Sequence, residues 1–251
     1  PIDNAFEDTR LYTFMDTIST TACRQRIFDF QKFLLMNEKE AVEKLKWYAK
    51  GGNMTFSYVG NLGKTFEYAV LEYPFAFWQW GQSSDSIPTN KNLDDYLSEL
   101  MKTSSISNFS DSDIKKYGPH YYLAATETGY YGYNIAPFKK YIQHFTSNPS
   151  ATFPPKEANA KPTDGSFHAG LQKWLAKKGN NILYIYGGID AWSAARVLVS
   201  DKVNSKSFLI PGASHGVARI KNLPENMKTE FAGKIKEWTG LDCKMDLLKT
   251  K

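Results

Sequence analysis

The sequence lacks several features that mark particular classes of protein. No apolar run reaches the roughly 18 residues that a membrane-spanning helix needs, so no membrane span is expected. The first residues do not have the basic-then-apolar layout of a secretory signal. Only two cysteines occur, Cys23 and Cys243, with neither metal-ligand spacing nor the number for a disulfide framework. Their position leaves both a single disulfide and two separate thiols open.

A concentrated block of charge is also missing. The 31 basic and 26 acidic residues give a net charge of +5, and the basic residues alternate with apolar ones, as on solvated helix faces. Nucleic acid is therefore not expected as a partner. The other histidines, His120, His144 and His168, have no metal-ligand spacing. The sequence thus predicts structural histidines there, no metal and no cofactor.

What is present begins with a helical, aromatic-rich first part. Residues 24–50 carry apolar side chains at helical spacing, and Gly51 and Gly52 end the pattern. A weaker pattern favours a helix over 66–73. Residues 147–165 hold four prolines and predict a linker or long loop. Further helices are predicted over residues 93–102, 111–117 and 137–145.

After this linker the pattern changes to alternating helices and strands. Short apolar runs at 181–186 and 207–210 are typical of strands buried in a parallel sheet. Helix, strand, helix, strand, helix is an α/β order, and two strands are too few for a stable sheet. The sequence therefore predicts the edge of a larger sheet. The helices of this part are predicted over residues 167–178, 194–200 and 224–239.

Each predicted strand ends in a loop that carries one catalytic residue type. Asp190 follows the first strand and His215 follows the second, 25 positions later. Open α/β sheets place functional residues at the carboxyl ends of their strands. An Asp followed by a His is the end of the Ser…Asp…His order of α/β-hydrolases. We therefore predict that Asp190 orients the imidazole of His215, which takes a proton from a serine.

No serine of the chain fits the nucleophile of such a triad. The segment 212–216 formally matches G-x-S-x-G, but no histidine follows His215 and the acid comes before this loop. Ser214 is therefore interpreted as a small loop residue, and neither Ser84 nor Ser193 has an elbow context. Because the chain starts at Pro1 and not at Met, we expect that an upstream part is missing, with the serine on it.

Three segments carry a resemblance to a known family. The acid loop 186–194, Tyr-Gly-Gly-Ile-Asp-Ala-Trp-Ser-Ala, resembles that of secreted prolyl tri- and tetrapeptidyl aminopeptidases, where Tyr-Gly-x-x-Asp-x-Trp recurs. The segment 211–216, Pro-Gly-Ala-Ser-His-Gly, is similar to their histidine loop. The opening 4–12, Asn-Ala-Phe-Glu-Asp-Thr-Arg-Leu-Tyr, resembles the stretch after their nucleophile elbow and the next strand.

This resemblance implies the C-terminal part of an α/β-hydrolase fold: the last strands of its parallel sheet plus a mostly helical cap domain. The implied segments are a core remnant at 1–20, the cap at 21–160 and the C-terminal core at 161–251. The implied activity is a secreted or periplasmic serine exopeptidase that removes short proline-containing peptides from a free N-terminus. Asp190 and His215 inherit the acid and base roles. The chain alone is expected to be inactive without the N-terminal half of the protein.

An exopeptidase needs a carboxylate for the substrate's ammonium group. Glu127, in a neutral and aromatic stretch, is the first candidate, and Glu72 and Glu67 are alternatives. Trp192, beside the predicted acid, is the second predicted substrate contact. The predicted partner is thus a peptide with a free N-terminus.

Two other readings of the same residues remain open. A prolyl carboxypeptidase or an esterase would use the same fold and the same acid and histidine. A different class is a non-catalytic module that binds peptide or glycan with the aromatic helical part.

Overall fold

The computed structural model describes residues 10–244 and forms two compact units. We call residues 10–77 and 82–168 the helical unit, and residues 78–81 together with 169–244 the sheet unit. Each is described by itself below. The predicted boundaries at residues 20 and 160 stay a prediction, and the opening motif up to Thr9 lies outside the described residues.

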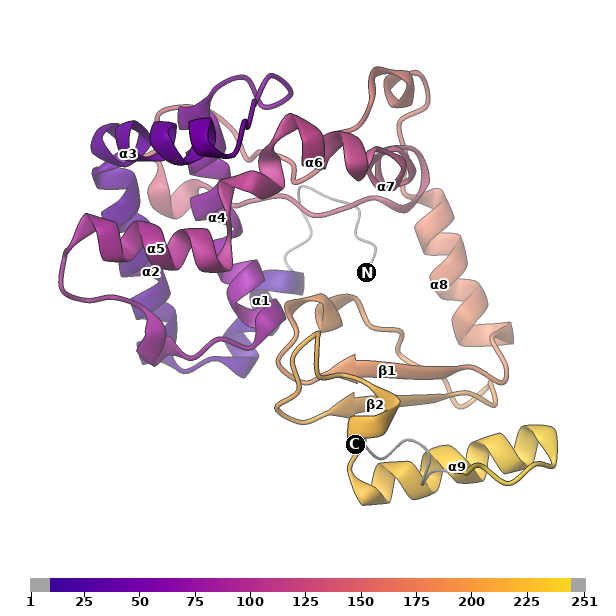
Figure 1. The fold of residues 1–251 in the computed structure, drawn as a ribbon. Coiled ribbons are helices and arrows are strands. Elements are labelled where there is room, and N and C mark those ends of the chain that lie inside the picture. Colours follow the sequence, from indigo (N-terminus) through magenta and orange to yellow (C-terminus); the bar gives the residue numbers. More distant parts are fainter. Residues whose placement is uncertain (1–9, 245–251) are drawn as a thin grey trace. The chain divides into compact units, whose positions relative to one another are not determined.

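The helical unit contains most of the helices in Figure 1. Its core is aromatic: Phe30, Phe66 and Tyr73 are among the largest fully buried side chains. Aromatic rings bury large apolar areas, which makes them the main source of stability here. The helices are α1 (Arg10–Ile18), α2 (Thr21–Met36), α3 (Glu38–Gly51), α4 (Leu62–Trp80, whose last residues belong to the sheet unit), α5 (Leu93–Thr103), α6 (Asp111–Lys116) and α7 (Gly118–Leu123).

The predicted helix over 24–50 is two helices, α2 and α3, which meet at Asn37. The Asn37 amide nitrogen donates to the carbonyls of Phe33 and Leu34, and its side-chain Nδ2 donates to Phe33 at 2.8 Å. An Asn side chain that bonds nearby backbone offers the chain an alternative to continuing the helix. The end at Gly51 and the helices over 66–73, 93–102 and 111–117 are confirmed.

The helix predicted over 137–145 is wrong. Only a short 3₁₀ turn, Ala136–Phe138, forms there. The amide nitrogens of Gln143 and His144 donate to the carboxylate of Glu67, in α4. These bonds replace the intrahelical ones, so the segment follows α4 instead of forming its own helix.

The sheet unit contains two parallel strands, β1 (Leu183–Gly187) and β2 (Lys206–Ile210). Both strands and the helices α8 (Ser166–Lys178) and α9 (Glu225–Thr239) were predicted and are confirmed. The helix predicted over 194–200 is instead a 3₁₀ turn, Ala191–Ala195. Figure 1 shows α9 along the sheet, where Phe231 packs on Phe208 in the core of this unit.

The fold of the described part is therefore mostly helical, with one small parallel sheet. This arrangement is compatible with the predicted C-terminal part of an α/β protein that carries a helical cap. None of the helices within residues 10–244 has the length and apolar character needed to cross a membrane.

Helix α4 continues through a proline because a side chain from α2 replaces a lost backbone donor. Pro74 has no N–H, so it cannot donate to the carbonyl of Val70 one turn earlier. The buried side chain of Gln31 donates its Nε2 to this carbonyl at 2.8 Å. The helix thus keeps a buried acceptor satisfied.

We expect Gln31→Leu to lower the free energy of unfolding by about 1–3 kcal/mol, because it leaves the Val70 carbonyl buried without a donor. The cost should shrink in a Pro74→Ala background, where residue 74 regains an N–H. Urea unfolding of both backgrounds measures the difference. The exposed Gln25→Leu on the same helix is the matched control, and an equal loss at both glutamines would contradict this account.

Candidate active site

The loops after β1 and β2 bring the predicted acid and histidine together. The Nδ1 atom of His215 lies 2.7 Å from Oδ2 of Asp190. Asp190 is 5% exposed, whereas the His215 side chain is 45% exposed. The carboxylate is thus desolvated and holds one ring nitrogen, so Nε2 is the nitrogen directed away from the acid. This arrangement fixes the imidazole tautomer.

The loop that carries Asp190 also fixes its carboxylate. It caps the 3₁₀ turn Ala191–Ala195, and its Oδ1 accepts a hydrogen bond from the amide of Trp192 at 3.2 Å. Burial raises the pKa of Asp190, while the contact with His215 acts in the opposite direction. The capping bond and the imidazole therefore use different carboxylate oxygens, which fixes the rotation of the group.

Glycines allow the two loops to touch through their backbones. The amide of Gly188 donates to Ile210 at 2.8 Å, and Ile189 donates to Ala213 at 3.1 Å. A Cβ at Gly188 would lie 2.7 Å from the carbonyl oxygen of Ile210, and one at Gly187 would overlap that of Ala213. Both contacts are with backbone, which cannot rotate away. The double glycine is therefore a condition for the acid–histidine contact.

The end of α4 supports the histidine loop, a contribution that sequence reasoning missed. The amide of His215 donates to the carbonyl of Gln79 at 2.9 Å, and the Trp80 ring meets the imidazole edge-on at 6.2 Å. Gly81 has φ +68°, and a Cβ there would lie 2.8 Å from Cβ of Ser214. The signal in the sequence was the glycine that ends the aromatic run, but nothing local relates it to residue 215.

The serines near this pair are structural in position. Ser214 is buried, and its carbonyl accepts from the amides of Val217 and Ala218. Ser193 is buried in the turn after Asp190. None of the serine hydroxyls of the sheet unit is hydrogen-bonded to the His215 ring.

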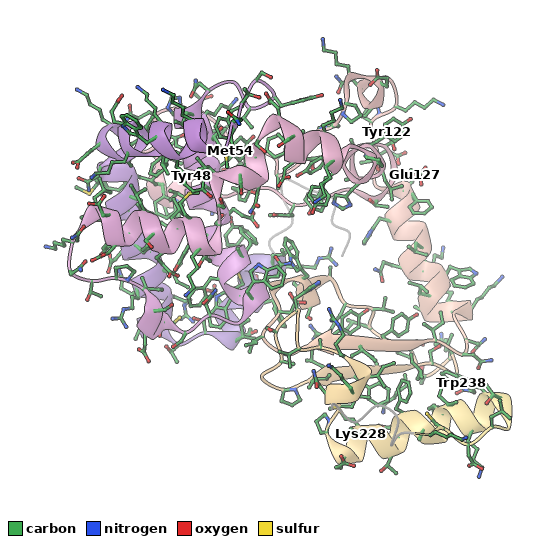
Figure 2. All side chains as sticks on the ribbon, in the orientation of Figure 1. Tyr48, Met54, Tyr122, Glu127, Lys228 and Trp238 are labelled. Carbon is green, nitrogen blue, oxygen red and sulfur yellow. The ribbon has the colours of Figure 1, made fainter. Side chains whose placement is uncertain are left out.

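The predicted substrate contacts fall in different units. Trp192 is partly buried in the sheet unit, directly after the acid. Glu127 is exposed in the helical unit, in a π turn, Ala124–Thr128 (Figure 2). Its carbonyl accepts from Thr163 at 3.0 Å. Both residues stay predictions as substrate contacts.

The alternative carboxylates, Glu67 and Glu72, differ strongly from Glu127. Glu67 is fully buried and bound to backbone amides. Glu72 is partly buried, and its Oε2 accepts from the hydroxyls of Tyr131 at 2.6 Å and Tyr133 at 2.7 Å. Desolvation raises the pKa of Glu72 to about 7, against the opposing effect of both tyrosine hydrogen bonds. Glu72 is thus a carboxylate in an aromatic, weakly solvated setting.

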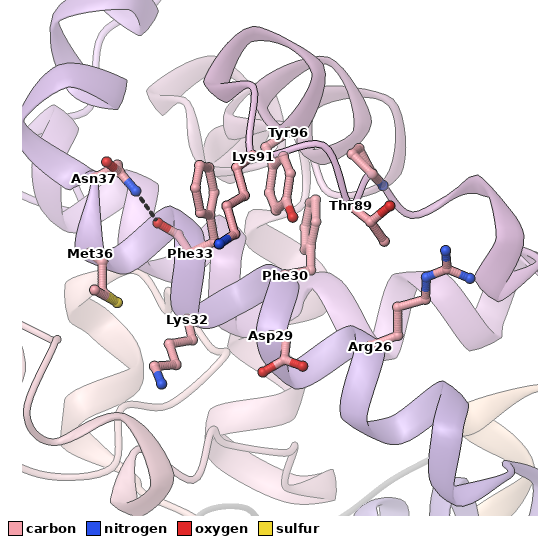
Figure 3. A pocket seen from close by; sticks show the side chains of 11 residues that line it. Arg26, Asp29, Phe30, Lys32, Phe33, Met36, Asn37, Thr89, Lys91 and Tyr96 are labelled. Carbon is pink, nitrogen blue, oxygen red and sulfur yellow. Dashed lines mark hydrogen bonds between the residues drawn. The ribbon is translucent and has the colours of Figure 1, made fainter.

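The helical unit also holds an open cavity of about 620 Å³ beside α2. Figure 3 shows the rings of Phe30, Phe33 and Tyr96 along it. Its rim mixes cations with Asp29, so it selects no single charge. None of the predicted site residues lines it.

Comparison with known proteins defines the class. The model of the family PS-10 peptidase S37 matches residues 2–246, so the chain belongs to this family of peptidases. It is also 25% identical over 244 residues to a prolyl tri/tetrapeptidyl aminopeptidase of Streptomyces mobaraensis. The match covers 95% of this chain and 51% of that protein, so the chain spans about half the length of this curated relative. No solved structure matches this chain. The predicted family resemblance is confirmed.

The contact between the loops can be tested with two glycines. We expect Gly187→Ala to cost about 1–3 kcal/mol of unfolding free energy, because the new Cβ forces the loops apart. It should also change the NMR signals of the His215 ring. Gly216→Ala is the matched control in the histidine loop, since nothing lies within 4 Å of its Cβ. Equal effects of both substitutions would refute the close-approach argument.

The raised pKa of Glu72 predicts a pH-dependent stability. The folded state keeps the proton of Glu72 up to about pH 7, while the ordinary pKa of a glutamate side chain is 4.5. Protonated Glu72 therefore stabilises the folded state fully below pH 4.5, and this stabilisation is lost as the pH rises through 7. We expect Glu72→Gln to abolish up to about 3 kcal/mol of this loss.

Urea unfolding between pH 4.5 and 8 measures this difference between wild type and Glu72→Gln. The control is the exposed Glu127→Gln, whose profile should run parallel to that of the wild type. Parallel profiles for both variants would show that Glu72 does not titrate in this range.

Proposed function

We propose that this chain supplies the acid and the base of a Ser-Asp-His triad in a serine exopeptidase with an α/β-hydrolase fold. The observation that carries the proposal is the 2.7 Å contact between Asp190 and His215, at the carboxyl ends of adjacent parallel strands. The order of the two residues and the membership in a peptidase family support it.

The proposed chemistry assigns each group one task. The serine hydroxyl attacks the peptide carbonyl while Nε2 of His215 takes its proton. The imidazolium then gives this proton to the leaving amine, and water hydrolyses the acyl-enzyme by the same route. Asp190 keeps the Nδ1–H directed at itself and stabilises the imidazolium without accepting its proton. Its burial strengthens this charge interaction.

The proposal places the nucleophile on a part of the protein outside residues 1–251. Its support is that no serine of the sheet unit is hydrogen-bonded to the His215 ring, and that the chain covers about half of its relative. The sheet supports it as well: β1 pairs only with β2 among the described strands, and Leu183–Tyr186 are only partly buried. A sheet of two strands is smaller than usual. The chain by itself is therefore proposed to be inactive.

The proposed substrate is a peptide with a free N-terminus, from which a short proline-containing peptide is removed. The name of the relative describes such an activity for that protein. Glu127 and Trp192 stay our predicted substrate contacts. The weakly solvated carboxylate of Glu72 is a further candidate for the ammonium, since charge pairs are stronger where water is excluded. A secreted or periplasmic location is part of this proposal.

The triad assignment predicts large losses of rate in the full-length protein. We expect His215→Ala and Asp190→Asn each to lower kcat by several orders of magnitude, because triad members act as a unit. Release of p-nitroaniline from N-terminally free peptide substrates measures this, with a simple ester as the comparison. Both variants should keep the circular dichroism spectrum of the wild type.

Two exposed residues provide the controls. His120→Ala and Asp201→Asn remove the same side-chain types at exposed positions and should retain wild-type rates. Wild-type turnover in His215→Ala would contradict the triad assignment. Faster hydrolysis of esters than of peptides would favour the esterase alternative. Peptide binding that survives loss of both Asp190 and His215, without any turnover, would favour the binding module.

A further inference from the structure

A second cluster of ionisable groups lies in the helical unit and takes no part in the proposed hydrolysis. Glu38 begins α3, Glu67 lies within α4, and His144 belongs to the loop after the 3₁₀ turn Ala136–Phe138. One potential ligand atom from each residue lies within 4.8 Å of the others. The Nε2 atom of His144 is 2.8 Å from Oε1 of Glu38. Glu67 and Glu38 lie 77 and 106 positions from His144, so no spacing in the sequence indicates the cluster.

Both carboxylates are deeply buried. Glu67 is fully buried and the side chain of Glu38 is 6% exposed. Oε1 of Glu38 meets His144, but its Oε2 is buried without a hydrogen-bond partner. A buried carboxylate oxygen without a donor is costly, because it has lost water and gained nothing. The cluster therefore holds a buried carboxylate oxygen without a hydrogen-bond partner.

Glu67 is already oriented by the backbone. Its Oε1 accepts from the amides of Gln143 and His144, and its Oε2 accepts from the same His144 amide, which leaves a lone pair on Oε2. Outer hydrogen bonds of this kind fix the direction of metal-ligating carboxylates. The partly exposed side chain of His144 gives the cluster a path to solvent.

Gly63 keeps one side of the cluster open. A Cβ at this position of α4 would lie 2.5 Å from Nε2 of His144 and 3.2 Å from Oε1 of Glu38. Any larger residue would displace the imidazole from the carboxylate. The absence of a side chain at Gly63 is thus a condition for the cluster.

We propose that Glu38, Glu67 and His144 form a binding site for a first-row divalent cation, with Zn²⁺ favoured. Zn²⁺ accepts both carboxylate oxygen and imidazole nitrogen, and three protein ligands leave its fourth position to a solvent molecule. The nitrogen ligand disfavours Ca²⁺ and Mg²⁺, which prefer oxygen. The cation would supply the missing partner of Oε2 and compensate the buried charge. This differs from the expectation, drawn from sequence spacing, that His144 is structural and that no metal is bound.

The role that the geometry assigns to this cation is structural. It links the start of α3, the middle of α4 and the loop at 143–144, which is the segment where a predicted helix does not form. A cation bound only by the folded chain stabilises it by mass action. The site is independent of the Asp190–His215 pair, so hydrolysis need not change when the cation is removed.

Titration of the chelator-treated protein with Zn²⁺, followed by calorimetry and native mass spectrometry, tests the proposal. We expect one Zn²⁺ per chain and a higher melting temperature with the metal. Glu38→Gln and His144→Gln should each weaken Zn²⁺ binding by more than about tenfold. Ca²⁺ should produce neither binding nor stabilisation.

Matched controls are Glu43→Gln, exposed on the same helix, and His120→Gln, an exposed histidine of the same unit. Both should bind Zn²⁺ as the wild type does. The carboxyl groups of Glu38 and Glu67 are near enough to share a proton instead. The metal site would be overturned if the wild type took up no Zn²⁺ and Glu38→Gln were as stable as the metal-free protein. That result would establish the shared proton between the two carboxyl groups. Equal Zn²⁺ binding by wild type, Glu38→Gln and His144→Gln would overturn it as well.

Discussion

The hydrogen bond between Asp190 and His215 depends on how closely two backbones can approach. Parallel pairing brings Gly187 level with Ile210 at the end of both strands, so the acid and histidine loops leave the sheet together. The double glycine then lets the first loop lie against the second without side chains between them. The acid and the histidine meet because of this backbone contact, and the end of α4 holds the histidine loop from another direction. A short stretch of glycine thus determines the geometry of the whole site.

The helical unit is organised by a different kind of interaction. Several of its buried polar groups are satisfied by side chains that are distant in sequence: Gln31 for Val70, and Glu67 for the amides at 143–144. Glu72 likewise accepts hydrogen bonds from two tyrosine hydroxyls that are distant in sequence. Because an unsatisfied buried polar group is costly, each such contact restricts which helices can pack together. The aromatic core supplies apolar burial, and these polar contacts specify one arrangement of it.

This difference explains what the sequence could predict. The contact between Asp190 and His215 could be predicted because its signal is local, a short apolar strand followed by a loop with one reactive residue. The helix errors have different causes: Asn37 breaks one helix with its own side chain, whereas the segment 137–145 binds Glu67, about 76 positions earlier. The helical spacing of apolar residues does not show that a side chain on another helix will bind the backbone of the segment. The tyrosine partners of Glu72 were hidden for the same reason, which is why Glu127 ranked first.

The contrast in exposure within the pair bears on how it would work. Asp190 is sealed by its loop, whereas almost half of the His215 side chain reaches the surface of the described residues. With Nδ1 held by the carboxylate, proton transfer has one remaining nitrogen and one direction. Any nucleophile must therefore approach from the Nε2 side, wherever in the protein it is encoded. In the proposed triad, contacts within the sheet unit alone hold the acid and the base in place, and preorganisation of this kind lowers the barrier to reaction.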